Sequence, residues 1–139
     1  MRKDFSNDIE NLFLDIFLPN SKPILVGIIY RPPDQSGFLS KLTDAINNSK
    51  KFDEQEVYIL GDLNMNILED KCIKYPRIYT EFCSLHGLKQ IINTPTRVTE
   101  NTATLLDHIL TNSTDRVSQS GVRDRFVRSH AHILYTKNL

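Results

Sequence analysis

The sequence has no excess of either charge. Lys and Arg together number 17, Asp and Glu also number 17, and the formal net charge is zero. A protein that is drawn to nucleic acid by its overall charge carries a clear positive excess. The composition therefore predicts no global attraction to nucleic acid, and any contact with a polyanion has to come from a local patch.

Cysteine and long apolar runs are also scarce. The two cysteines, Cys72 and Cys83, do not have metal-ligand spacing, and two cysteines do not form a disulfide framework. No run reaches the 18 apolar residues that a membrane-spanning helix needs, and the first 13 residues contain acidic side chains that a secretory signal avoids. We expect an intracellular protein, nuclear or cytoplasmic, that is not secreted and has no membrane partner.

The length and composition are those of one folded domain. The chain has 139 residues, of which 40% are hydrophobic and 24% charged. This is an ordinary globular composition, and the chain is long enough to bury a core. We therefore treat residues 1–139 as a single domain.

The first third of the chain predicts a β-hairpin followed by a helix. Two apolar runs, 9–18 and 23–31, are separated by the turn sequence PNSK, and Pro32-Pro33 ends the second run because proline cannot donate to a strand ladder. Ser36 then predicts a helix N-cap. The apolar residues that follow have helical spacing: Phe38, Leu39, Leu42, Ala45 and Ile46.

The remainder predicts more strands than helices. We expect one amphipathic helix over 74–86, ended by Gly87, and a threonine-rich polar loop over 94–104. The expected strands are 56–60, 88–92, 105–111, 115–122 and 131–136. Since helices do not follow every strand, we do not expect a regular parallel βα fold. Mixed sheets with helices outside them, as in a layered α/β sandwich, fit better.

Polar side chains stand at the ends of several of these strands. They are Tyr30 before the prolines, Asp62 and Asn64 in the segment VYILGDLNMNIL, Asp107 and His108 in LLDHIL, and His130 and His132 near the end of the chain. Each has a purely structural alternative: Asp-x-Asn after a strand is a common turn, and tyrosines and histidines at such positions are more often packed structural residues than catalytic ones. The aspartate in LLDHIL is harder to explain as structural, because a buried carboxylate costs several kcal/mol unless it is paired.

Taken together and in this order, these segments resemble the endonuclease/exonuclease/phosphatase family, which has the DNase I-like fold. The resemblance is greatest to the endonuclease domains of non-LTR retrotransposons of the long interspersed, jockey-like type. The matching segments are KPILVGIIYRPP (22–33), EVYILGDLNMNIL (56–68), YTEFCSLHGLKQIINTPTRVT (79–99), TLLDHILTN (104–112) and DRVSQSGV (115–122). The resemblance implies an α/β fold, a four-layer sandwich of mixed sheets with outer helices.

It also implies a metal-dependent phosphodiesterase that nicks DNA and uses Mg²⁺ or Mn²⁺. By resemblance, Asp62 activates the attacking water and is a possible metal ligand, Asn64 holds the phosphate or its developing charge, and Tyr30 contacts the phosphate region. Asp107 pairs with a C-terminal histidine, which the simplest match places at His130. We add Asn66 and Arg128 as expected substrate-binding residues.

The chain departs from the family pattern at two places. The family's early asparagine and glutamate, the latter a principal metal ligand, precede the strand with which this chain begins. The chain therefore matches the C-terminal two-thirds of the domain, an incomplete sandwich. In the family's terminal Ser-Asp-His triplet, Ser129 stands where the aspartate is expected, and a shifted register would place His132 rather than His130 at the histidine.

These departures set the expected function. With the metal carboxylates missing, we expect the chain alone to nick DNA weakly or not at all. The alternative is a non-catalytic module that binds nucleic acid or protein on the same scaffold, favoured by the basic cluster Arg123, Arg125 and Arg128. A half-sandwich would also leave one sheet face uncovered, which predicts self-association through that face.

Overall fold

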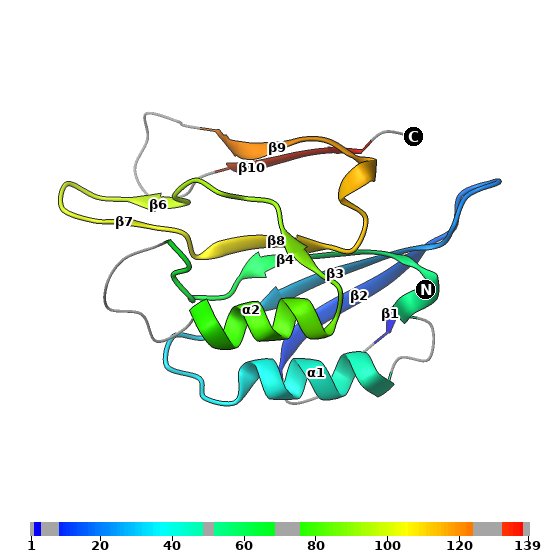
Figure 1. Cartoon of the computed structure of the whole chain (residues 1–139), viewed down its shortest axis with the longest axis horizontal. Helices are drawn as coiled ribbons and strands as arrows, with labels where there is room; N and C mark the ends of the chain where they lie inside the picture. The colour runs from blue at the N-terminus through cyan, green and yellow to red at the C-terminus, as the bar shows by residue number, and fades with distance from the viewer. Residues whose placement is uncertain (1, 4–8, 49–51, 69–75, 124–131, 138–139) are drawn as a thin grey trace.

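The computed structural model describes residues 2–3, 9–48, 52–68, 76–123 and 132–137. Its centre is a six-stranded mixed sheet with the strand order β1-β2-β3-β4-β8-β5 (Figure 1). The strands are β1 (Arg2–Lys3), β2 (Glu10–Ile16), β3 (Ile24–Tyr30), β4 (Glu56–Asp62), β8 (Asp107–Thr111) and β5 (Lys89–Gln90). Strands β3 and β4 are parallel, and the other neighbours are antiparallel. The predicted α/β class with a mixed sheet is confirmed.

The hairpin expected over 9–31 is formed by β2 and β3. Its register pairs Ile16 with Ile24 and Glu10 with Tyr30. Along β3, Leu25 and Ile29 are buried on one face, whereas Ile28 and Tyr30 are exposed on the other. This alternation defines the two faces of the sheet.

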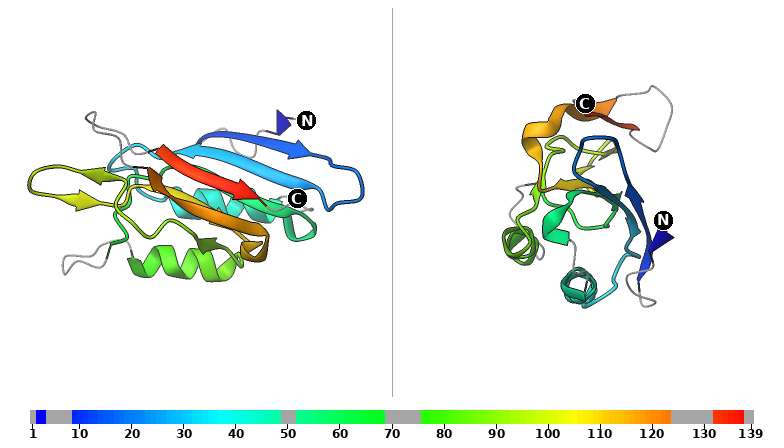
Figure 2. Two further views of the ribbon diagram at one scale, coloured as in Figure 1. Left: turned by 90° about the horizontal axis from the view of Figure 1, so that it is seen from above. Right: turned by 90° about the vertical axis from the view of Figure 1, so that its right-hand side faces the viewer.

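Helices α1 (Phe38–Asn48) and α2 (Pro76–Leu85) cover the face to which Leu25 and Ile29 point (Figures 1 and 2). All five apolar residues predicted for the first helix are buried. The helix begins one residue later than a Ser36 cap would place it, because the carbonyl of Gly37 accepts the first helical bond, from Lys41 N–H at 3.1 Å.

Gly87 ends α2 as predicted. It has a positive φ of 62°, which glycine adopts without a steric penalty. Its N–H donates to the Ser84 carbonyl, and the N–H of Leu88 donates to the Cys83 carbonyl at 2.8 Å. These two bonds form a Schellman motif, which satisfies the last carbonyls of the helix.

A second hairpin, β9 (Val117–Arg123) and β10 (His132–Lys137), forms a third layer over the opposite face of the sheet (Figure 2). Val122 packs against a small apolar cluster made by Ile92, Leu105 and Ile109. Both strands were predicted, with bounds shifted by one or two residues. On β2 and β3 the same face carries exposed apolar side chains, namely Leu14, Ile16 and Ile28.

The segment 94–104 is not a simple loop as we predicted. It contains a short hairpin of β6 (Arg97–Val98) and β7 (Ala103–Thr104), closed by the bond from Thr99 N–H to the Thr102 carbonyl at 2.8 Å. We predicted a loop because the segment is polar, but its threonines and valine also have a high preference for β-strands. The strand expected over 88–92 is only two residues long. Within the described ranges, no helix is long and apolar enough to cross a membrane.

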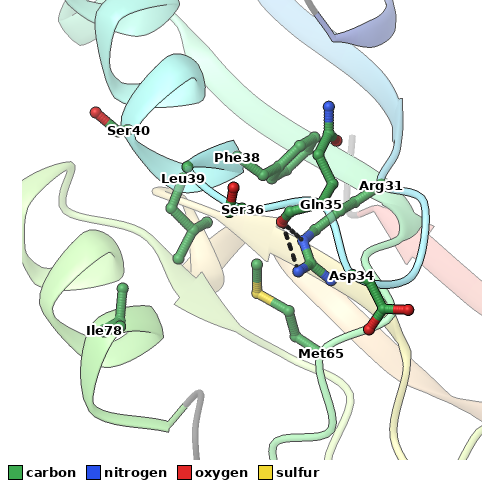
Figure 3. Close-up of a pocket in the computed structure, with 10 residues that line it drawn as sticks. Arg31, Asp34, Gln35, Ser36, Phe38, Leu39, Ser40, Met65 and Ile78 are labelled. Carbon is green, nitrogen blue, oxygen red and sulfur yellow. Dashed lines mark hydrogen bonds between the residues drawn. The ribbon is translucent and has the colours of Figure 1, made fainter.

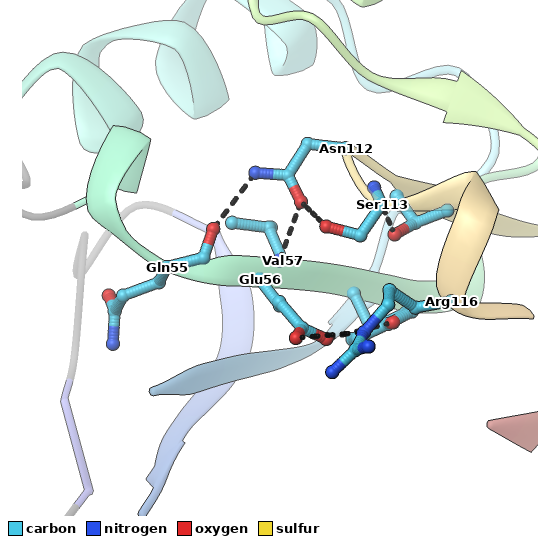
Figure 4. A network of polar contacts seen from close by, with 8 residues as sticks. Gln55, Glu56, Val57, Asn112, Ser113 and Arg116 are labelled. Atoms are coloured by element: carbon cyan, nitrogen blue, oxygen red, sulfur yellow. Dashed lines mark hydrogen bonds and ion pairs between the residues drawn. The ribbon is translucent and has the colours of Figure 1, made fainter. Parts of the chain in front are cut away.

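The beginning of β4 is fixed by a polar network (Figure 4). The side chain of Asn112 accepts from Val57 N–H at 2.9 Å and donates to the Gln55 carbonyl at 3.0 Å. Glu56 is buried and forms an ion pair with Arg116, at 3.5 Å, from the 3₁₀ turn η2 (Thr114–Arg116). A second 3₁₀ turn, η1 (Phe52–Glu54), precedes this end of the strand.

Candidate functional site

Three predicted site residues lie in one row at the end of the central sheet. Tyr30 is the register partner of Asp62 across β3 and β4, and Asp62 is the partner of Asp107 across β4 and β8. Register partners on neighbouring strands are about 5 Å apart and point to the same face. Three strands therefore bring a phenol and two carboxylates together on the face opposite the helices.

Glycine allows β4 to approach β3 closely at this end. A Cβ on Gly61 would overlap the carbonyl oxygen of Ile29, its partner on β3. The strand does not end at residue 60, as predicted, but continues to Asp62, whose carbonyl accepts from Arg31 N–H at 2.9 Å. The glycine thus serves strand pairing, and Asp62 is held in the last rung of the ladder.

Asn64 follows in a left-handed turn. Its φ is 47°, a conformation that asparagine tolerates better than most residues. Its backbone N–H donates to Asp62 Oδ1 at 3.0 Å, and its side-chain Nδ2 donates to the Arg31 carbonyl at 2.8 Å. The structural role as a turn and the site hypothesis are therefore compatible, because the turn holds Asn64 next to Asp62 and to the residue that follows Tyr30.

Asn66 has a tethering role in this structure. Its Oδ1 accepts from Leu105 N–H at 3.1 Å and from Leu68 N–H at 3.3 Å. These bonds attach the segment after β4 to the segment before β8. Substrate binding by Asn66 stays a prediction beside this role.

Asp107 is positioned by a residue that sequence reasoning did not single out. The buried hydroxyl of Thr96 accepts from the N–H groups of Leu106 and Asp107, at 3.0 and 3.1 Å. The TPTR segment that supports the family resemblance thus fixes the backbone from which Asp107 projects. Thr96 is the third residue of TPTR (94–97), so the motif itself was the sequence signal that could have identified it.

His108 points away from the row, into the core. It is 1% exposed, and its Nδ1 lies 2.6 Å from the hydroxyl of Tyr79 and its Nε2 3.0 Å from the Met65 carbonyl. Burial lowers the pKa of His108 to about 4, against the opposing effect of its backbone bonds. The ring is therefore neutral, with Nε2–H donating to Met65 and Nδ1 accepting from Tyr79. It supports the 63–66 loop structurally.

Cys83 lies beside Tyr79 in the same core. It is a buried free thiol, and burial raises its pKa to about 11. Burial likewise raises the pKa of Tyr79 above its ordinary value. A protonated, buried thiol is a poor nucleophile, so this cluster serves packing rather than catalysis.

The C-terminal candidates fall outside the described residues. His130, Arg128, Ser129 and Arg125 are all in 124–131, so the expected pairing of Asp107 with His130 stays a prediction. Strand β9 ends and β10 begins at the end of the molecule at which β3 and β4 also end (Figures 1 and 2). In the described part of the chain, no group of three or more His, Cys, Asp or Glu side chains could hold a metal ion.

Solved structures share this architecture. The endonuclease domain of TRAS1, a telomere-specific non-LTR retrotransposon, superposes with a TM-score of 0.78 at 15% identity, over 97% of this chain and 64% of that one. An endonuclease/exonuclease/phosphatase family protein of Leptotrichia buccalis gives 0.69 at 13% identity, over 93% and 54%. This chain has the DNase I-like fold.

The same fold carries other chemistry. The inositol polyphosphate 5-phosphatase domain of a synaptojanin, solved with inositol (1,4)-bisphosphate and calcium, matches with a TM-score of 0.55 at 9% identity, over 93% of this chain and 50% of that one. This chain thus spans about two-thirds or less of the length of these DNase I-like structures. No family model and no curated protein matches the sequence.

Proposed function

We propose that this chain carries the water-activating and phosphate-binding part of a DNA-nicking phosphodiesterase site. The observation that supports this most is the row of Tyr30, Asp62 and Asp107 across three strands, with Asn64 in the turn that follows. All four residues stand in motifs that predict site residues from the sequence alone. Three strands that are distant in sequence bring Tyr30, Asp62 and Asp107 to the same end of one sheet face, and Asn64 follows in the next turn.

The chemistry suits a phosphodiester. Hydrolysis needs an attacking water in line with the leaving oxygen and donors for the charge that develops on phosphorus oxygens. Asp62 orients and activates the water. Asn64 has a second amide N–H besides the one bound to Arg31, and this donor can reach a phosphate oxygen, as can the hydroxyl of Tyr30.

A divalent cation fits the donor chemistry only in part. Mg²⁺ and Mn²⁺ prefer oxygen ligands, which Asp62 and Asp107 offer from adjacent register positions. The described residues do not complete a coordination sphere. Asp62 would hold the ion together with water and phosphate oxygens, and the ion would neutralise charge on the phosphate. An incomplete sphere predicts weak nicking by this chain alone, or none.

DNA is the proposed substrate, and its binding has to be local because the chain is neutral overall. The TRAS1 domain, whose fold is shared over nearly the whole of this chain, is an endonuclease of a retrotransposon. The sequence also predicts that the protein is intracellular and that it self-associates, and both of these stay predictions.

The test is nicking of supercoiled plasmid by the purified chain in Mg²⁺, in Mn²⁺ and in EDTA. We expect slow nicking or none; any nicking should disappear in EDTA and in Asp62→Asn, and survive in the control Asp115→Asn, an exposed aspartate of η2. Nicking that persists in EDTA or in Asp62→Asn would contradict the proposal. If a folded chain does not nick but binds duplex in EDTA, with affinity falling steeply as salt rises, the non-catalytic binding module is the correct description.

A further inference from the structure

Arg31 connects the two loops that form the proposed site. It follows Tyr30 directly and is only 2% exposed. Its Nε and Nη2 donate to the Gln35 carbonyl at 3.1 and 2.7 Å (Figure 3). Its Nη1 donates to the carbonyls of Leu63 and Asn64 at 3.2 and 3.3 Å. One guanidinium therefore holds the loop after β3 against the loop after β4.

The bond to Leu63 has a consequence for Asp62. The peptide unit that joins Leu63 to Asn64 is planar, and its C=O and N–H point in opposite directions. Its oxygen accepts from Arg31, and its N–H donates to Asp62 Oδ1 at 3.0 Å. The guanidinium thus acts on the carboxylate through a single peptide unit: it fixes the direction of the N–H and, as a cation, polarises it toward Asp62.

Arg31 also fixes Asn64 from both sides. Its Nη1 donates to the Asn64 carbonyl, and its own backbone carbonyl accepts from Asn64 Nδ2. Arg31 therefore contributes to fixing both the left-handed backbone of Asn64 and the direction of its side-chain amide. A buried arginine is costly, and at this position it is compensated by bonds that converge on the residues proposed to act.

We propose that Arg31 is a positioning residue of the site, which fixes the Leu63–Asn64 peptide against Asp62 and holds the side-chain amide of Asn64 in place for the substrate. This role of Arg31 rests on the proposed function, because it assumes that Asp62 and Asn64 act on a phosphodiester. The hydrogen bonds of Arg31 themselves do not depend on any substrate. Lysine could not replace arginine here, because an ammonium lacks the planar fork that serves three carbonyls at once. The pocket beside Arg31, about 320 Å³ in volume and mainly apolar, is lined by Phe38, Leu39, Met65 and Ile78 and does not take part (Figure 3).

The experiment measures amide proton chemical shifts by NMR at one fixed pH, without DNA or metal. The wild type is compared with Arg31→Lys, Arg31→Met and the control Arg116→Met, which removes the arginine at the other end of β4. We expect the Asn64 amide proton to move clearly upfield in both Arg31 variants, because its hydrogen bond to Asp62 Oδ1 is no longer held in line, and to stay unchanged in the control. An arginine that only stabilises the fold would lower stability and leave the Asn64 signal where it is, which would overturn the proposal.

A wild-type measurement covers the case in which the Arg31 variants do not fold. Scalar couplings across hydrogen bonds should join the Arg31 side-chain nitrogens to the carbonyl carbons of Leu63 and Asn64. The Asn64 amide proton should also move upfield in Asp62→Ala, whose side chain cannot accept its hydrogen bond. The absence of either result in the folded chain overturns the proposal. Because neither measurement uses DNA, a failure of the proposed nuclease function would be seen separately, in the plasmid assay.

Discussion

At the scale of single residues, His108 shows how the loop after β4 is supported from within the core. Its neutral ring joins the hydroxyl of Tyr79 to the carbonyl of Met65, between Asn64 and Asn66. The residue was a site candidate because it adjoins Asp107. Adjacent residues of a strand point to opposite faces, so only one of the two can belong to the row.

The lowered pKa of His108 predicts how stability changes with pH. The unfolded histidine takes up a proton near its ordinary pKa of 6.5, whereas the folded one does so only at about 4. Between these values the unfolded state binds more protons, so stability falls as pH falls, by up to about 1.4 kcal/mol per pH unit. Urea unfolding should show this slope in wild type and a smaller one in His108→Gln.

The control for that prediction is His86→Gln. Burial also lowers the pKa of His86, but its side chain is only half-buried. The control should retain most of the wild-type slope between pH 6.5 and 4. Equal slopes in wild type and His108→Gln would show that His108 is not the neutral buried group described here.

Gly61 gives a second prediction at this scale. Gly61→Ala should destabilise the fold by roughly 2 kcal/mol or more, because its Cβ would overlap the Ile29 carbonyl oxygen and push β4 away from β3. Gly121→Ala on β9 is the matched control, since nothing lies within 4 Å of the added atom. Thermal unfolding of the two variants should differ clearly, and similar losses would mean that β3 and β4 are not in this register.

At the scale of elements, β4 is fixed at both ends by hydrogen bonds from other parts of the chain. The carbonyl of Asp62, its last residue, accepts from the backbone N–H of Arg31. At its beginning, the side chain of Asn112 bridges Gln55 and Val57 (Figure 4). A strand that is anchored at both ends holds Asp62 at a constant position relative to Tyr30 and Asp107.

Asn112→Ala should therefore cost about 1–3 kcal/mol, because the Val57 N–H and the Gln55 carbonyl both lose their partner. Asn47→Ala, at an exposed position of α1, should change stability by less than about 0.5 kcal/mol. Urea unfolding measures both. If the two variants are equally stable, the bridge contributes nothing to the anchoring of β4.

At the scale of the whole molecule, one sheet face is covered unevenly. Hairpin β9–β10 covers the part near β4 and β8, whereas Ile28 on β3 is 51% exposed, and Leu14 and Ile16 are exposed on the same face of β2. Exposed apolar side chains that gather on one face favour association.

We predict concentration-dependent self-association in sedimentation velocity, reduced by Ile28→Lys. The control Ile78→Lys changes an equally exposed isoleucine on α2, on the helical side, and should leave association unchanged. A wild-type chain that is monomeric at every concentration tested would show that the exposed face does not drive self-association.

Sequence patterns predicted the large elements well because these elements follow from periodicity. The β2–β3 hairpin, α1 and the Gly87 end of α2 each have a local signal that the structure satisfies. The β6–β7 hairpin was missed because its strands have two residues each, too few for any periodicity. Pairings of that length depend on tertiary contacts.

The site residues could be predicted as a set from the sequence, but the residues that hold them in position could not. Tyr30, Asp62, Asn64 and Asp107 stand in recognisable motifs, and the register brings three of them into one row. The roles of Arg31, Thr96 and His108 depend on which carbonyls and N–H groups face them after folding. That information lies in non-local geometry, which a single sequence does not display.

We expect the cation and the phosphodiester to bind at the end of the sheet where Tyr30, Asp62 and Asp107 meet. The most direct measurement is amide NMR of the chain with a short DNA duplex, titrated with paramagnetic Mn²⁺. We predict selective broadening of the Asp62, Asn64 and Asp107 signals, and loss of this broadening in Asp62→Asn. Broadening centred elsewhere, or no broadening in a chain whose spectrum shows that it is folded, would contradict binding at this site.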